Sequence, residues 1–240
     1  MREGRAGQQP LLAVEGLHAF YGESHVLHGV DLQVYPGEVV AVLGRNGAGR
    51  TTTLKAVMGL MGRARGSVRL NGAELLGLAP HDIARRGIGY CPEERGIFAS
   101  LSCEENLLLP PRLADGGMGL DEIYALFPNL HERRTSPGTR LSGGEQQMLA
   151  LARILRTGAR LLLLDEISEG LAPVIVQAIA RAIRQLRALG FTLVMVEQNF
   201  RFAAPLADHF YVMEGGRMVQ GFATAQLEAH MDMLHAHLGV

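Results

Sequence analysis

Apolar and polar positions alternate along the first part of the chain. Between residues 11 and 34, apolar side chains recur at roughly every second position, and the polar break Tyr21-Gly22-Glu23 interrupts them. This period is typical of half-buried β-strands, and the break predicts a turn between two of them. The next run, Val39-Val40-Ala41-Val42-Leu43, is apolar throughout. We therefore expect an antiparallel β-subdomain that leads into a buried strand.

The pattern changes in the second half of the chain, where apolar strands alternate with helices. This alternation is typical of a parallel sheet covered by helices. Prolines and glycine pairs separate several shorter helices before it, at about residues 92–158. The chain thus predicts an α/β fold with a mostly parallel sheet, an N-terminal antiparallel β-subdomain and an inserted α-helical lobe. Helices are expected at residues 52–60, 80–86, 103–109, 120–127, 173–189, 200–207 and 224–238.

Composition narrows the classes of protein that fit. The 240 residues are 48% hydrophobic, which is enough for one domain with its own core. Basic and acidic residues number 23 and 24, so the chain lacks the basic footprint that duplex nucleic acid demands, and no nucleic-acid partner is expected. Two cysteines cannot form a disulfide framework, which fits a reducing, cytoplasmic setting. No run approaches the ~20 apolar residues that span a bilayer. Residues 1–10 predict a flexible tail, and residues 11–240 the domain.

A glycine-rich loop follows the buried strand and opens into a helix. In a phosphate-binding loop, glycines let backbone amides surround an anion, and the helix N-terminus adds partial positive charge. The expected pattern is G-x-x-x-x-G-K-[ST], in which Lys reaches the phosphates and the hydroxyl binds Mg²⁺. Arg50 stands where Lys is expected. The alternative is a strand-to-helix turn with an incidental Arg. The candidate nucleotide-binding residues are Gly44, Asn46, Gly47, Ala48, Gly49, Arg50, Thr51 and Thr52.

Two acids end a later apolar strand. The run Leu161-Leu162-Leu163-Leu164 is followed by Asp165 and Glu166. Ligands of open α/β sheets bind at the carboxyl ends of the strands. We therefore expect Asp165 to hold Mg²⁺ beside Thr51, and Glu166 to orient or deprotonate the water that attacks the γ-phosphate. The alternative is an acid pair that caps a helix.

A second helix start is also shaped for an anion. Ser142 is followed three residues later by Glu145 and then by apolar residues at helical spacing, which predicts a capping box. Gly143 and Gly144 add exposed amides. One nucleotide already has its phosphates in the first loop, so this second site would serve the nucleotide of a second copy of the chain.

These motifs resemble a known family. Leu141-Ser142-Gly143-Gly144-Glu145-Gln146, placed between the glycine-rich loop and the acid pair, is similar to the signature motif of the ATP-binding-cassette (ABC) ATPases. The resemblance runs from about residue 11 to residue 239 and implies an ABC-type P-loop NTPase core. Three further stretches resemble the ATPase subunits of branched-chain amino-acid importers and of their urea- or amide-importing relatives. They are Tyr90-Cys91-Pro92-Glu93, Gly170-Leu171-Ala172-Pro173 and Val196-Glu197-Gln198-Asn199.

The resemblance also implies roles for three residues outside these motifs. Tyr21 would stack on adenine, and Glu93 takes the place of the usual Gln in the loop that joins the core to the helical lobe. Gln198 would be the counterpart of the switch His, able to hydrogen-bond water or γ-phosphate but not to carry a proton charge. The alternatives are a packing residue at a hairpin edge, a surface Glu and a solvent-facing Gln. Arg50, Ile167 and Glu169 depart from the family's pattern.

The sequence thus predicts an importer ATPase that works as a sandwich of two cassettes. ATP, with Mg²⁺, would lie between the phosphate loop of one cassette and Ser142–Gly144 of the other, which is a second copy or a sister subunit. The partner would be an integral-membrane permease, served indirectly by a periplasmic solute-binding protein. The ATPase would lie on the inner face of the cell membrane. The alternatives are a regulatory cassette with little hydrolysis and a non-transport ABC ATPase.

Overall fold

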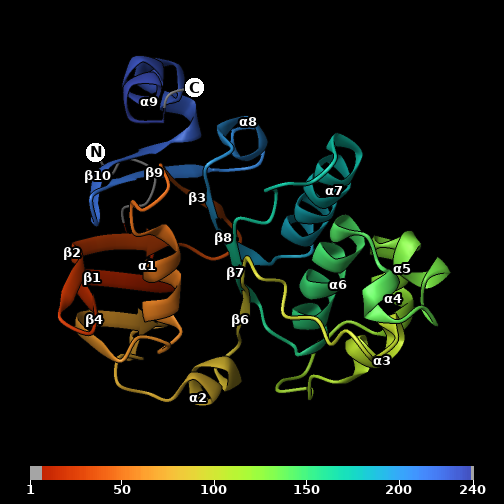
Figure 1. The fold of residues 1–240 in the computed structure, drawn as a ribbon. Coiled ribbons are helices and arrows are strands. Elements are labelled where there is room, and N and C mark those ends of the chain that lie inside the picture. Colours follow the sequence, from red (N-terminus) through yellow and green to blue (C-terminus); the bar gives the residue numbers. More distant parts are fainter. Residues whose placement is uncertain (1–6, 239–240) are drawn as a thin grey trace.

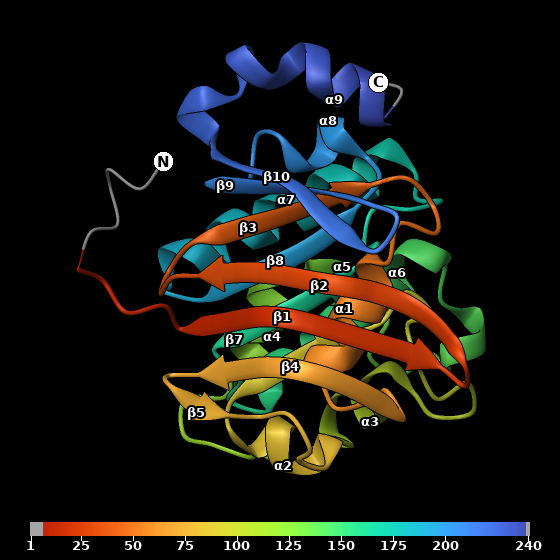
Figure 2. The ribbon, with the colours of Figure 1, turned by 90° about the vertical axis from the view of Figure 1, so that its left-hand side faces the viewer.

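The N-terminal alternation folds into an antiparallel sheet, as expected, in a computed structural model that describes residues 7–238. The predicted tail therefore lies outside the described residues up to residue 6. Strands β1 (Leu12–Tyr21) and β2 (Ser24–Val34) form a hairpin, and β4 (Arg63–Leu70) and β5 (Ala73–Glu74) extend it in the order β2-β1-β4-β5. Figure 2 shows this sheet face-on, in front of the rest of the chain.

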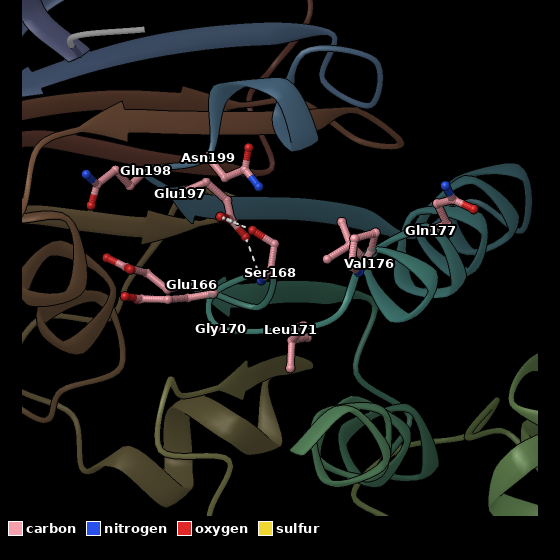
Figure 3. Close-up of a pocket in the computed structure, with 11 residues that line it drawn as sticks. Glu166, Ser168, Gly170, Leu171, Val176, Gln177, Glu197, Gln198 and Asn199 are labelled. Carbon is pink, nitrogen blue, oxygen red and sulfur yellow. Dashed lines mark hydrogen bonds between the residues drawn. The ribbon is translucent and has the colours of Figure 1, made fainter. Parts of the chain in front are cut away.

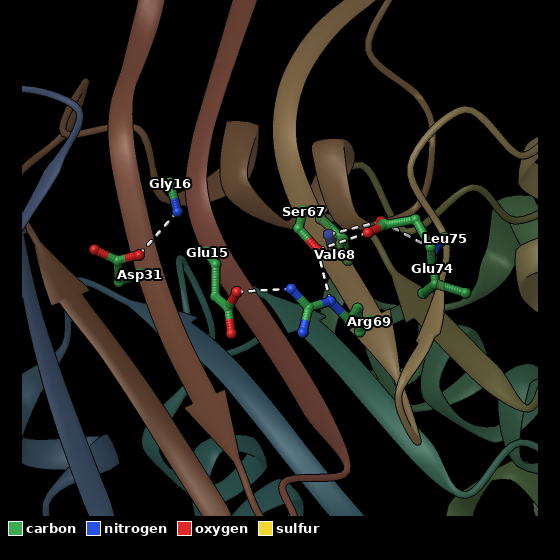
Figure 4. A network of polar contacts seen from close by, with 8 residues as sticks. All are labelled: Glu15, Gly16, Asp31, Ser67, Val68, Arg69, Glu74 and Leu75. Carbon is green, nitrogen blue, oxygen red and sulfur yellow. Dashed lines mark hydrogen bonds and ion pairs between the residues drawn. The ribbon is translucent and has the colours of Figure 1, made fainter.

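Polar contacts tie the short edge strand β5 to its neighbours. The Glu74 carboxylate accepts the Val68 N–H at 2.8 Å and the Ser67 hydroxyl at 2.6 Å. Arg69, which lies on β4 with Ser67 and Val68, forms an ion pair with Glu15 of β1 at 2.8 Å. These contacts run across the sheet in Figure 4. They satisfy backbone groups at an edge that only a two-residue strand covers.

The second sheet has the order β10-β9-β3-β8-β7-β6. The pairs β3·β8, β3·β9, β7·β8 and β6·β7 are parallel, and β10 pairs with β9 in the antiparallel sense. Parallel strands end at the same edge, so residues that follow them meet there. The strands are β3 (Val39–Gly44), β6 (Ile88–Cys91), β7 (Leu161–Asp165), β8 (Thr192–Glu197), β9 (His209–Glu214) and β10 (Arg217–Ala223).

Helices cover the second sheet on both faces. Helix α1 lies between the two sheets, whereas α6 and α7 lie on the other side of β6 and β7, and α3, α4 and α5 gather around α6 (Figure 1). The helices are α1 (Arg50–Val57), α2 (Pro80–Arg85), α3 (Cys103–Leu108), α4 (Leu120–Leu126), α5 (Pro128–Glu132), α6 (Gly143–Arg156), α7 (Pro173–Ala188), α8 (Phe200–Ala203) and α9 (Met231–Leu238). A 3₁₀ turn, Gly138–Arg140, precedes α6. Within residues 7–238, none of the helices is both long and apolar enough to cross a bilayer.

Strand β3 divides the hydrophobic core into two parts. Val40 and Val42 pack with the antiparallel sheet and α1, whereas Val39, Ala41 and Leu43 pack with α6, α7 and the helical lobe. Successive side chains of a strand point to opposite faces, so an unbroken apolar run serves both cores. The strand is therefore buried at all six positions, and the loop that follows it is firmly anchored.

Three expected helices differ from the structure by two residues or more at one or both ends. The first helix begins at Arg50 rather than at residue 52, which places Arg50 in its first turn. Helix α8 ends at Ala203 because Pro205 has no N–H to continue it. The expected closing helix is two 3₁₀ turns, Thr224–Gln226 and Glu228–His230, followed by α9. The His230 ring stacks on Phe222 at 4.2 Å, and this contact holds the bent segment against β10.

Candidate functional site

The loop between β3 and α1 has the shape of an anion cradle. A Cβ on Gly44 would lie 2.5 Å from the Met213 carbonyl oxygen, and Gly49, at φ 107°, would place a Cβ 2.9 Å from the Leu27 side chain. Only glycine fits at these positions. Helix α1 starts without a side-chain cap and without an acid in its first turn. Its first amides are thus available to a bound anion.

Arg50 places a buried cation in this cradle. Its side chain is 3% exposed, and Nη2 donates to Glu166 Oε1 at 2.6 Å and to Asn46 Oδ1 at 3.2 Å. Nη1 is buried and has no hydrogen-bond partner among residues 7–238. Buried donors are normally paired, and guanidinium binds phosphate oxygens well. The orphaned Nη1 therefore fits a phosphate group in this loop.

Asp165 lies at the end of β7 and is fully buried. Thr51 Oγ1 donates to its Oδ1 at 2.9 Å, and Tyr90 Oη donates to its Oδ2 at 2.9 Å. Burial raises the pKa of Asp165. A hydroxyl and a carboxylate are oxygen ligands of the kind that Mg²⁺ prefers, together with phosphate oxygens and water. Residues 7–238 contain no cluster of three or more His, Cys, Asp or Glu that could hold a metal ion alone.

Glu166, the residue after Asp165, has a constrained backbone conformation. Its φ of 46° lies in the left-handed region, which a non-glycine residue adopts only when its surroundings fix it. Burial and a hydrogen bond with Glu169 raise the pKa of Glu166 to about 7, although the positive charge of Arg50 acts in the opposite direction. A general base works best with a pKa near the working pH. Gln198 is exposed and lines, with Glu166, a cavity of about 600 Å³ (Figure 3).

Ser142 and Glu145 form the capping box that their spacing predicts. Ser142 Oγ accepts the Glu145 N–H at 3.3 Å, and the Glu145 carboxylate accepts the Ser142 N–H at 2.7 Å. That carboxylate also meets Arg133 at 3.3 Å. Its bonds are thus used within its own lobe, and any effect of Glu145 on a nucleotide would pass through the helix start. A Cβ on Gly144 would lie 2.7 Å from Ile175, so this glycine lets α6 approach α7.

The structure brings only part of the predicted site together. Arg50, Thr51, Asp165 and Glu166 are in contact, whereas no hydrogen bond or ion pair within residues 7–238 joins residues 142–145 to the phosphate loop. Among the other predicted residues, Thr52 is buried and Glu93 is exposed. Partial loss of solvent around its carboxyl, together with the negative charges of Glu169 and Asp165, raises the pKa of Glu93. Tyr21 is 50% exposed at the end of β1.

Three residues to which the sequence assigned no role contact the site or the elements around it. Tyr90 bonds to Asp165, and its position at the end of a strand beside β7 was the available signal. Arg95 donates to Gln147 at 3.1 Å and so connects the loop after β6 to α6. Glu197 is buried at the end of β8 beside Gln198, and an acid at a strand end is the same kind of signal that revealed Asp165.

Comparison with known proteins decides the family. The model of the family described as ABC transporter matches residues 27–169, more than half of the chain. This range includes the phosphate loop, the capping box and the acid pair. The chain belongs to the ABC transporter family.

The sequences of known relatives align with nearly the whole of this ABC cassette. It is 42% identical over 232 residues to the high-affinity branched-chain amino acid transport ATP-binding protein BraG of Pseudomonas aeruginosa, covering 95% of this chain and 100% of that protein. It is 34% identical to the lipopolysaccharide export system ATP-binding protein LptB of Escherichia coli K12, covering 95% and 97%. The crystal structure of a nucleotide-free ATP-binding cassette matches with a TM-score of 0.81 at 21% identity, covering 93% of this chain and 96% of that one.

These findings confirm the resemblance and the expected fold. This ABC cassette is an ATPase, as members of its family are. The match to the solved cassette, at its low identity, concerns the fold alone.

Proposed function

We propose that this chain is the ATP-binding and ATP-hydrolysing subunit of an importer for branched-chain amino acids or related small polar solutes. The observation that carries hydrolysis is the contact of four groups: Arg50 and Thr51 at the start of α1, and Asp165 and Glu166 at the end of β7. They supply a cation, a hydroxyl and two carboxylates beside an uncapped helix start. This is the set of groups that phosphoryl transfer from ATP requires.

Each group has a distinct task. The amides of residues 44–52 and Arg50 bind the phosphates, with Nη1 free for a phosphate oxygen. Thr51 and Asp165 would hold Mg²⁺, which would neutralise charge on the phosphates. Glu166 orients the attacking water and accepts its proton, and its pKa of about 7 suits that task. Gln198 hydrogen-bonds the water or the γ-phosphate. Tyr21 presents an exposed ring on which adenine can stack.

A second cassette completes the site. Helix α6, whose N-cap is Ser142, lies on the other side of β6 and β7 from α1 (Figure 1). We therefore assign its start, Ser142–Gly144, to the nucleotide held by a second copy or a sister subunit. The helical lobe exposes Phe98, Leu108 and Leu109, each about half exposed, where an integral-membrane permease can dock. The complex would sit on the inner face of the membrane and receive solute from a periplasmic binding protein.

Glu94 allows a test of the docking surface. Its side chain is 69% exposed, and its ion pair with Lys55 is long, at 3.9 Å. Glu94→Lys should lower transport in the assembled complex while the isolated subunit keeps its ATPase activity. Glu132→Lys, an exposed change in the same lobe, is the matched control. An equal loss of transport and of isolated ATPase activity would place Glu94 in the nucleotide site instead.

Uptake measurements test the solute. BraG is more similar to this chain than LptB is, 42% against 34%, which favours amino-acid import over lipopolysaccharide export. Deleting this subunit from its host should abolish uptake of labelled leucine, isoleucine or valine, and the Glu166→Gln variant should not restore it. Normal uptake with a defect in the cell envelope would favour the exporter.

The Arg50–Glu166 pair also favours a second candidate, a regulatory cassette with little hydrolysis, because the expected base is bound to a cation. Mg²⁺-dependent release of phosphate by the purified chain distinguishes the two. A rate no higher than that of the Glu166→Gln variant would identify the regulatory cassette.

A further inference from the structure

A buried acid at the end of β8 has no role in the chemistry described so far. Glu197 is 1% exposed and directly precedes Gln198. Its Oε1 accepts the Ser168 N–H at 3.2 Å, and its Oε2 is 2.8 Å from the Ser168 hydroxyl. Ser168 is itself 4% exposed. Figure 3 shows the two residues joined by both bonds at the inner wall of the cavity.

These bonds fasten the turn that carries Glu166. The Glu166 N–H donates to the Val196 carbonyl at 3.0 Å, and two residues later Ser168 is held by Glu197. Ile167, between them, is buried. The turn is therefore attached to the end of β8 on both sides of Ile167. Glu166 needs such support, because its left-handed φ of 46° is costly for a residue with a side chain.

We propose that Glu197 is a positioning residue for ATP hydrolysis, which holds Ser168 and thereby sets Glu166 and Gln198 at a fixed spacing across the cavity. This inference rests on the proposed ATPase function. A small displacement suffices to matter, since a misplacement of about 1 Å in a catalytic group can cost about 10²-fold in rate.

The chemistry of Glu197 determines which substitution preserves the contact. Burial, with Glu166 acting in the same direction, raises the pKa of Glu197 to about 8, while the bonds from Ser168 and the charge of Arg50 oppose the rise. The Ser168 hydroxyl donates to Oε2, and the Ser168 N–H donates to Oε1. Glutamine has the same shape: its Oε1 can accept the N–H, and its Nε2 can donate to the hydroxyl oxygen, which is also an acceptor. Leucine can do neither.

Steady-state ATPase kinetics with two variants test the role. Glu197→Leu should lower kcat about 10-fold or more while KM for ATP changes less than about threefold, because binding groups are untouched. Glu197→Gln should restore kcat to within about threefold of wild type near pH 7. Ser168→Ala should lower kcat as well, and the Ser168→Ala/Glu197→Leu double variant should lose little more than Glu197→Leu alone.

A matched control separates positioning from general stability. Thr192 lies at the other end of β8, is also buried, and accepts the Gly37 N–H at 2.9 Å. Thr192→Val should lower the melting temperature without lowering kcat. Wild-type kcat in Glu197→Leu, or equal losses of kcat and nucleotide affinity, would overturn the positioning role. An inactive wild-type chain would instead refute the ATPase function itself, so the two failures are distinguishable.

Discussion

Nη2 of Arg50 lies 2.6 Å from Oε1 of Glu166, and both side chains are nearly buried. The cation of the phosphate loop and the acid after β7 therefore neutralise each other across 116 residues of sequence. Removing one partner of a buried pair leaves an uncompensated charge, which typically costs about 3–5 kcal/mol. The pair consequently couples the stability of the cassette to its chemistry.

Arg50→Lys should raise turnover several-fold with little change in nucleotide affinity. A guanidinium can hold Glu166 and a phosphate at once through different nitrogens, whereas a compact ammonium that moves to the phosphates releases the acid. Steady-state ATPase rates and nucleotide titrations measure the two quantities. Arg45→Lys, an exposed change in the same loop, is the control. If turnover falls, the loop is fitted around the guanidinium.

Glu166→Gln should slow hydrolysis by about 10²-fold or more and trap an ATP-bound dimer, because the amide cannot accept the proton of the water. Size-exclusion runs with Mg²⁺-ATP should show a dimer for this variant. Glu132→Gln, an exposed change in the helical lobe, should behave as wild type. Only monomer for Glu166→Gln, with and without the permease, would contradict the shared site.

The free energy of unfolding should fall as pH rises from about 5 to about 8. Burial raises the pKa of Glu166 to about 7 and that of Glu197 to about 8, whereas both carboxyl groups titrate near their ordinary value of 4.5 in the unfolded chain. Between these values the folded chain binds more protons, so stability is lost with rising pH, by at most about 1.4 kcal/mol per pH unit for each group. Urea denaturation at several pH values measures the slope. Glu197→Gln should make it shallower, and an unchanged slope would show that Glu197 does not titrate in this range.

Gly144→Ala should destabilise the fold by about 1–3 kcal/mol, because its Cβ would lie 2.7 Å from the stiff, branched Ile175 side chain. Gly143→Ala is the matched control, since its Cβ would meet only the flexible end of Arg95, at 3.0 Å. Thermal unfolding of the two variants provides the comparison. Equal stability would show that α7 yields freely to the extra methyl group.

The sequence predicted the elements whose signals are local. Ser142 and Glu145 are three residues apart, and their capping box formed as the spacing requires. Val39–Leu43 is apolar throughout and became a central strand. In contrast, Arg217–Ala223 is mostly exposed and lacks a clear period, so the edge strand β10 was not anticipated. Its antiparallel pairing with β9 depends on a neighbour rather than on its own pattern.

Contacts between distant segments could not be deduced in the same way. The residue types indicated that Thr51, Asp165 and Glu166 would meet at the strand ends. They did not indicate that Arg50 would form an ion pair with Glu166, or that Glu197 would hydrogen-bond to Ser168, which lies 29 residues away in the sequence. Such choices depend on the backbone turn at Glu166, whose left-handed φ no local pattern announces.

The hydroxyl groups of Thr51 and Tyr90, which both donate to Asp165, bear on the order in which a metal ion and a nucleotide would enter the site. Thr51 and Tyr90 each donate to one carboxylate oxygen, so an ion that arrives alone must displace hydrogen bonds inside a buried site. An ion that arrives on a nucleotide would bring phosphate oxygens that compensate for the lost hydrogen bond from Thr51. A divalent cation would therefore enter this site more readily together with a nucleotide than alone.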